Sequence, residues 1–139
     1  MTAVPFSLAR IASTADGGRF LRLALRLDAA GSGALGLGGL VGATALAPLL
    51  GTTSTAMMAT GGFLVVYALA LVVIAGRPAI SRPAAWTVVV GNSVWVLASI
   101  VTAMGGPLTA IGVAVVLAQA AAVLVFIDME WLGLRRMAA

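Results

Sequence analysis

Apolar residues along this chain gather in four long stretches, at about positions 28–50, 56–75, 84–104 and 107–127. Each stretch is close to the ~20 residues that an α-helix needs to cross the ~30 Å hydrocarbon core of a bilayer. None shows the alternation of a transmembrane β-strand, and only helices and closed barrels satisfy their backbone hydrogen bonds in lipid. The pattern therefore predicts four transmembrane helices.

The breaks between the stretches carry the residues that end and begin helices. Gly51 follows the first stretch, and the hydroxyl residues at 52–55 can cap the second helix. Pro83 suits the first turn of the third helix. Two glycines and a proline at 105–107 predict a tight turn into the fourth helix.

Charge then gives the helices an orientation. Every cation in the chain is an arginine, and all precede the first stretch, lie between the second and third, or follow the fourth: Arg10, Arg19, Arg22, Arg26, Arg77, Arg82, Arg135 and Arg136. The other two connections carry no charge. By the positive-inside rule, we expect the arginine side, and with it both chain ends, to be cytoplasmic.

The segment before the first stretch has a pattern of its own. Arg19, Arg22 and Arg26 fall on one narrow face of a helix, which predicts a short amphipathic helix lying on anionic headgroups or, alternatively, docking a soluble partner. The predicted fold is therefore all-α, with an interfacial segment at 1–27, a four-helix transmembrane domain at 28–136 and a tail at 137–139.

Composition agrees with a lipid environment and excludes several chemistries. Apolar residues make up 62% of the 139 positions, charged residues 9%, and the mean hydropathy is +1.16. Cysteine and histidine are absent, which excludes disulfides, zinc sites with nitrogen or sulfur ligands, and haem held by either residue. The scattered arginines do not form a nucleic-acid footprint. Because these nitrogen and sulfur ligands are missing, we expect no metal and no cofactor. We expect no enzyme activity, because no nucleophile–base pair can be assembled.

Polar side chains enter three of the predicted helices at similar depth. Tyr67, Asn92 and Gln119 lie about 9–15 Å from the arginine side at ~1.5 Å per residue, and Trp95 shares the helical face of Asn92. Such groups can fix helix register through interhelical hydrogen bonds. Alternatively, they line a pocket for a neutral polar molecule, a quinone head or a lipid group.

The acids are expected at the membrane edge. Asp28 opens the first stretch and faces away from the arginines of the preceding segment, Asp128 closes the fourth, and Glu130 follows in the interface. An interfacial salt bridge to Arg77, Arg82 or the C-terminal arginines is the simplest role for Asp28. A proton-accepting mouth of a transport path is the alternative.

The first stretch is rich in glycine. Gly38 and Gly42 form a small-xxx-small pair, which favours close helix packing. The packing partner is another helix of the bundle or, alternatively, a second copy of the chain.

Several short motifs share an order and spacing over about residues 22–136: Arg26-Leu27-Asp28-Ala29, Tyr67, Asn92-Ser93-Val94-Trp95, Gln119-Ala120 and Gly133-Leu134-Arg135-Arg136. In the order and spacing of these motifs, the chain resembles small four-span integral membrane proteins of unknown function that recur in GC-rich Gram-positive bacteria. The resemblance implies a multi-pass fold and a location in the bacterial cytoplasmic membrane, and it transfers no binding or catalytic role.

Two functions follow as hypotheses. The first is a non-enzymatic accessory or structural subunit in the lipid bilayer, which packs with itself as a homo-oligomer or with a larger membrane complex. The alternative is a small transporter or binding protein for a neutral or lipophilic ligand, which uses the intramembrane polar layer.

Overall fold

The computed structural model describes residues 15–138, and these form four long helices with no strand among them. The helices are α2 (Arg19–Leu50), α3 (Ser54–Gly76), α4 (Arg82–Gly105) and α5 (Ala110–Ala138). All four are long and apolar enough to cross a membrane. The chain is a multi-pass helical protein, as the hydropathy pattern predicts.

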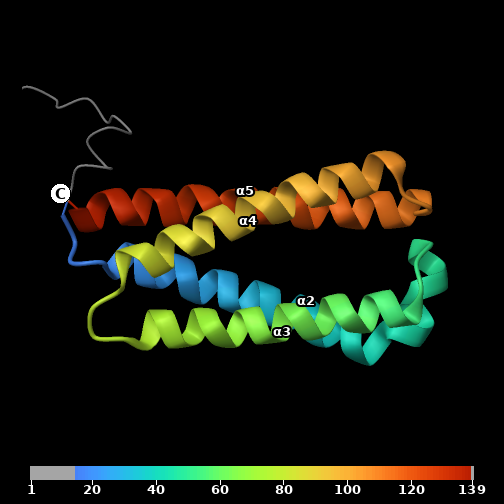
Figure 1. Ribbon diagram of the computed structural model, residues 1–139, viewed down its shortest axis with the longest axis horizontal. Helices are drawn as coiled ribbons and strands as arrows, with labels where there is room; N and C mark the ends of the chain where they lie inside the picture. The colour runs from blue at the N-terminus through green and yellow to red at the C-terminus, as the bar shows by residue number, and fades with distance from the viewer. Residues whose placement is uncertain (1–14, 139) are drawn as a thin grey trace, which may run out of the picture.

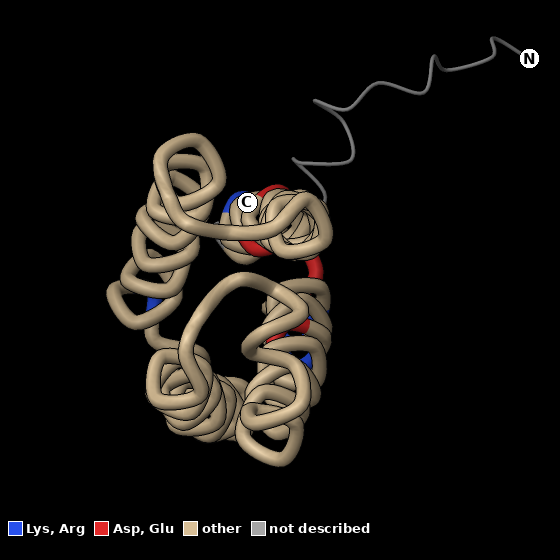
Figure 2. The backbone as a smooth tube through the Cα atoms, turned by 90° about the vertical axis from the view of Figure 1, so that its right-hand side faces the viewer, with Lys and Arg blue, Asp and Glu red and all other residues tan. Residues whose placement is uncertain are grey.

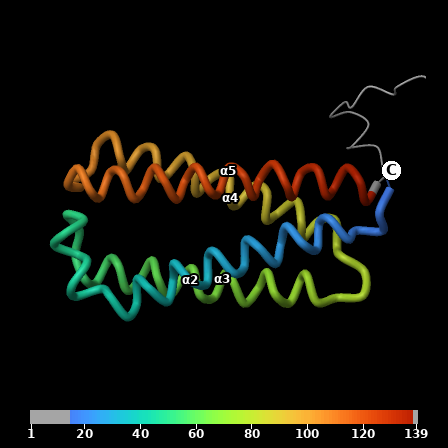
Figure 3. The backbone as a smooth tube through the Cα atoms, turned by 180° about the vertical axis from the view of Figure 1, so that it is seen from behind, coloured from blue at the N-terminus to red at the C-terminus, as the bar shows by residue number. Residues whose placement is uncertain are grey.

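The helices form two antiparallel hairpins that lie against each other (Figures 1 and 3). The helix pairs that pack together are α2–α3, α2–α5 and α4–α5. The start of α2, the α3–α4 connection and the end of α5 lie at one end of the bundle. The arginines of the described chain flank these segments, so they gather at that end. Figure 2 looks onto the opposite end, where the two short connections carry no charge.

The predicted interfacial helix at the N-terminus is wrong for the residues that the structure describes. Positions 19–27 are the first turns of α2, which runs unbroken to Leu50. Leu21 and Leu25 are fully buried in the core, so this segment is held by packing in the bundle and not by headgroups. Positions 1–14 of the predicted segment lie outside the described residues.

The close contact that holds the start of α2 against α5 depends on a glycine. A Cβ on Gly133 would lie 2.6 Å from the Cα of Leu21, so only glycine allows the two backbones to approach this closely. Leu134 is buried beside it in the same core. This crossing explains why α5 continues well past residue 127, where the hydropathy pattern placed its end.

Local signals set the other helix ends. The side chains of Thr53 and Ser81 accept hydrogen bonds from the backbone N–H groups of Ala56 (3.1 Å) and Ala84 (3.3 Å), which caps α3 and α4. Gly51 ends α2 in the left-handed conformation.

The arginine-free ends of the two hairpins are joined by Thr109. Its hydroxyl donates to the Leu49 carbonyl at 2.7 Å and its N–H donates to the Leu50 carbonyl at 3.1 Å. The same hydroxyl accepts from the Gly112 N–H at 3.0 Å. Helix α5 therefore begins at Ala110 and not at residue 107.

Candidate functional site

Asn92 lies at the centre of a buried polar cluster to which all four helices contribute. Its Oδ1 accepts a hydrogen bond from the Tyr67 hydroxyl at 2.8 Å. Its Nδ2 donates to Asp28 Oδ2 at 2.8 Å and to Glu130 Oε2 at 3.1 Å. The amide thus uses both hydrogens on two carboxylates, and the phenol fixes which way the amide points.

Asp28 is fully buried, on the side of α2 that the sequence places away from the arginines. Its Oδ1 accepts from the Ser32 hydroxyl at 2.8 Å, and its Oδ2 lies 3.4 Å from the Tyr67 hydroxyl in addition to the Asn92 bond. Among the described residues, the predicted salt bridge to Arg77 or Arg82 is not formed. The physical reason is depth: Asp28 is the tenth residue of α2, about 14 Å along the axis from its start.

Glu130 is also fully buried, although the sequence placed it in the interface. It lies eight residues before the end of α5, about 12 Å inside the helix. Its Oε1 has no hydrogen-bond partner within the described chain. The sequence did contain a signal for this position, because Gln119 and Glu130 are eleven residues, or three turns, apart and share one helical face.

A second polar group lies further along the bundle, away from the arginine end. Trp95 Nε1 donates to Gln119 Oε1 at 2.8 Å, which joins α4 to α5. Gln119 Nε2 donates to the Ser99 hydroxyl and to the Val116 carbonyl, both at 2.8 Å. The two amides that the sequence placed in one layer therefore belong to two neighbouring networks.

Phe63 connects these networks through ring contacts. Its ring stacks on Tyr67, with centroids 6.3 Å apart, and on Trp95, with centroids 6.0 Å apart, and both pairs are nearly parallel. The rings of α3 thus reach across to α4, whose backbone does not pack along α3. Phe63 is 57% exposed, so this aromatic row forms the side of the bundle that faces outward between α3 and α4.

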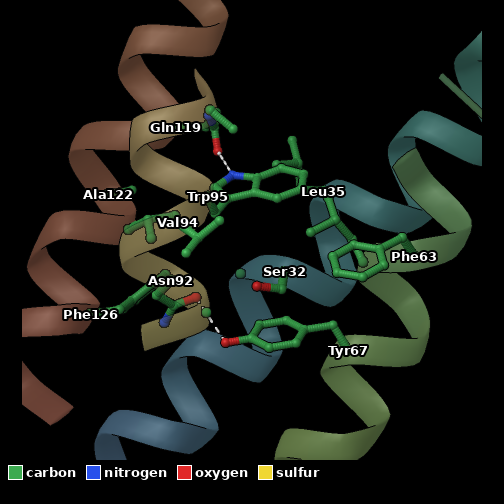
Figure 4. Close-up of a pocket in the computed structure, with 15 residues that line it drawn as sticks. Ser32, Leu35, Phe63, Tyr67, Asn92, Val94, Trp95, Gln119, Ala122 and Phe126 are labelled. Carbon is green, nitrogen blue, oxygen red and sulfur yellow. Dashed lines mark hydrogen bonds between the residues drawn. The ribbon is translucent and has the colours of Figure 1, made fainter. Parts of the chain in front are cut away.

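A cavity of about 550 Å³ lies between the two hairpins and is lined by all four helices. Its walls include Ser32, Tyr67, Asn92, Trp95 and Gln119, with Phe63, Val94, Ala122 and Phe126 around them (Figure 4). This volume is typical of small-molecule sites, which commonly enclose ~300–1,000 Å³ and combine apolar walls with a few convergent polar groups. The buried carboxylates lie directly behind the Ser32, Tyr67 and Asn92 side chains.

A second cavity of about 490 Å³ continues toward the arginine-free end. It is lined by Thr60, Ser99 and Thr102 among others, and it shares Trp95 and Gln119 with the first. The hydrogen-bonded pair of Trp95 and Gln119 therefore lies at the boundary of the two cavities.

The structure brings together the four residues of the predicted pocket, Tyr67, Asn92, Trp95 and Gln119, and adds Asp28 from the predicted interfacial group. It does not bring in Asp128, which is exposed. Sequence reasoning missed Ser32, Glu130 and Phe63. Within residues 15–138 no three His, Cys, Asp or Glu side chains are placed to hold a metal.

The predicted glycine pair lies away from the closest helix contact. A Cβ on Gly38 would meet open space, and one on Gly42 would meet only Leu46 of the same helix. The close contact of α2 with α3 is at Gly36 and Gly61, where a Cβ on either would lie within 2.8 Å of the other's carbonyl oxygen.

The arginines at the same end of the bundle have other partners. Arg22 donates to the carbonyls of Ala75, Arg77 (2.8 Å) and Pro78 (3.2 Å), which close the end of α3. Arg136 forms an ion pair with Asp16 at 3.3 Å. These contacts fasten the chain segments at this end of the bundle.

Comparison with known proteins adds no assignment: no protein-family model, curated protein or solved structure matches this chain. The resemblance to small four-span proteins of Gram-positive bacteria therefore stays a prediction.

Proposed function

We propose that this protein binds a small, largely apolar molecule with one polar end in the cavity between its hairpins, as a membrane-embedded binding or transport protein. The observation that carries this proposal is the cavity itself. Its walls come from all four helices, and they combine polar side chains at two levels with a row of three aromatic rings.

The lining suits an aromatic or quinone-like ligand. The rings of Phe63, Tyr67 and Trp95 offer faces for offset stacking, which contributes ~0.5–1.5 kcal/mol per pair beyond area burial. The phenol of Tyr67 and the hydroxyl of Ser32 lie where a carbonyl or hydroxyl of the ligand could exchange hydrogen bonds with them. A molecule with an aromatic ring and a carbonyl or hydroxyl group would therefore be complementary to the lining of the cavity.

A route into the cavity follows from how α3 and α4 meet. Phe63 and Val94 both line the cavity, and they are 57% and 60% exposed. Because α3 and α4 contact each other through side chains there, a ligand dissolved in the bilayer can enter by rotation of Phe63. We propose that the arginine end faces the cytoplasm of a bacterial cell, in accordance with the positive-inside rule.

The test is calorimetric titration of the purified chain in mild detergent with 2-naphthol, a bicyclic aromatic molecule with one hydroxyl. Gly91 lines the cavity, and a Cβ there meets open space, so Gly91→Leu is expected to fill part of the cavity without a backbone clash. Gly62 is also a mid-helix glycine with open space around it, but it does not line the cavity. Gly62→Leu is therefore the matched control.

We expect saturable binding to the wild type and to Gly62→Leu, and at least a tenfold loss of affinity in Gly91→Leu. Equal heats for all three chains would mean that the probe partitions only into detergent, and would refute the proposal. Co-purification of a stoichiometric larger partner, with no saturable binding, would instead favour the accessory role.

A further inference from the structure

Two carboxylates meet in this bundle around one amide. Asp28 Oδ2 and Glu130 Oε2 both lie within 3.1 Å of Asn92 Nδ2, so these two oxygens cannot be more than about 6 Å apart, which is the range in which like charges disfavour joint ionisation. Both side chains are fully buried. Two buried negative charges at this separation disfavour joint ionisation, so a proton on one acid or a cation beside the pair stabilises them.

The groups that face the pair are neutral on every helix that surrounds it. They are Ser32 on α2, Tyr67 on α3 and Asn92 on α4, while the acids themselves come from α2 and α5. Arg22, on the same helix as Asp28, is engaged with carbonyl oxygens at the end of α3, and Arg26 is exposed.

The hydrogen bonds also distinguish the two acids. Asp28 accepts from Ser32 and from Asn92, with the Tyr67 hydroxyl at 3.4 Å, which suits an ionised carboxylate. Glu130 Oε2 accepts from Asn92, and within the described chain its buried Oε1 has no hydrogen-bond partner. A buried oxygen without a partner is more costly on a charged carboxylate than on a neutral, protonated acid.

We propose that Asp28 and Glu130 share a single proton and that a lipophilic cation entering the cavity displaces it. This inference rests on the proposed function, since it needs the cavity to bind ligands. It adds the class of ligand: an apolar body with one permanent or acquired positive charge.

The exchange conserves charge at the site. With one proton the pair carries one net negative charge; when the cation binds and the proton leaves for solvent, two carboxylates and one cation again carry one net negative charge. No covalent bond forms or breaks other than the O–H bond of the acid. The cation would lie against the Phe63, Tyr67 and Trp95 rings, which attract positive charge through their faces.

The probes are benzyltrimethylammonium and its neutral carbon isostere, neopentylbenzene, which have the same shape and differ by the charge. The quaternary ammonium group has no proton to lose, so any proton released comes from the protein. Titration calorimetry in two buffers of different ionisation enthalpy counts the protons released per bound cation. Infrared difference spectroscopy reports the C=O band of a protonated carboxyl without any ligand.

We expect close to one proton released per cation by the wild type at neutral pH, and an affinity that rises about tenfold per pH unit while one proton is exchanged. In Glu130→Gln the cation is expected to bind with no proton released, because Asp28 supplies the negative charge alone. Asp28→Asn combined with Glu130→Gln is expected to bind the cation at least tenfold more weakly. The protonated carboxyl band of the wild type is expected to disappear in Glu130→Gln.

Three results would overturn the inference. One is cation binding by the wild type without proton release. Another is an infrared spectrum in which Glu130→Gln removes no protonated carboxyl band. The third is binding of 2-naphthol or neopentylbenzene but not of the cation, which would leave the proposed function standing. Failure of all three probes to bind would overturn both proposals.

Discussion

Replacing Asn92 with leucine removes the side chain that donates a hydrogen bond to each of the two buried carboxylates. The amide donates to Asp28 and to Glu130 and accepts from Tyr67. Interhelical hydrogen bonds in membrane proteins average ~0.6 kcal/mol and reach ~1.7 kcal/mol. Two bonds to carboxylates at the upper value and one at the average give a loss of about 4 kcal/mol in the free energy of unfolding.

The assay is reversible unfolding of the purified chain in mixed micelles with increasing sodium dodecyl sulfate, followed by circular dichroism. Ser93→Ala is the control on the same helix. The Ser93 hydroxyl donates only to the Val89 carbonyl of its own helix, so its loss is expected to change the stability by less than ~0.5 kcal/mol.

A second variant tests whether Asn92 stabilises the fold through the two acids or only through packing. In the Glu130→Gln background, a glutamine amide can donate to Asp28, and only one carboxylate remains. We therefore expect Asn92→Leu to cost at least ~1 kcal/mol less there than in the wild type, a coupling typical of residues in one network. A loss below ~1 kcal/mol for Asn92→Leu alone, or an equal loss in both backgrounds, would refute the reasoning.

Three further predictions concern the fold around the site. Gly133→Ala should destabilise the chain by about 2 kcal/mol or more in the same unfolding assay, because its Cβ would meet the Leu21 backbone; Gly62→Ala, in open space, should be neutral or stabilising, and equal effects would contradict the close contact. Arg22→Ala should cost about 1–2 kcal/mol through the lost contacts at the end of α3, whereas Arg26→Ala on the exposed face should cost little. Single cysteines in the α3–α4 connection should be labelled by a membrane-impermeant thiol reagent only in opened cells, and labelling in intact cells would reverse the proposed orientation.

The hydropathy pattern predicts the number and type of helices because a segment that crosses the bilayer must be apolar over its whole length. It must also form its backbone hydrogen bonds internally, which an α-helix does. The pattern does not predict where α2 begins or where α5 ends. The additional helical turns at 19–27 and 128–138 contain charged residues, so the sequence pattern predicts that they lie outside the transmembrane helices. In the structure Leu21 packs on Gly133, and both segments are part of α2 and α5.

The sequence predicted the part of the candidate site that lies inside the apolar runs and not the part near their ends. Tyr67, Asn92, Trp95 and Gln119 stand out as polar or aromatic residues inside apolar runs, and the structure places them along one cavity. Asp28 and Glu130 lie near the ends of apolar runs, where acids commonly face headgroups. Only the helix-to-helix register shows that one amide bridges them, and a single sequence does not contain that register.

The central claim is that the cavity beside Asn92 is a binding site. The most direct measurement is fluorescence of a chain in which Trp95 is the sole tryptophan. Trp86 and Trp131, which are 40% and 43% exposed, would be replaced by phenylalanine. Because Trp95 lines the cavity, 2-naphthol should accept its excitation energy and quench it saturably, and Gly91→Leu should abolish this effect. Quenching that rises linearly with probe concentration, or that is unchanged in Gly91→Leu, would contradict the account.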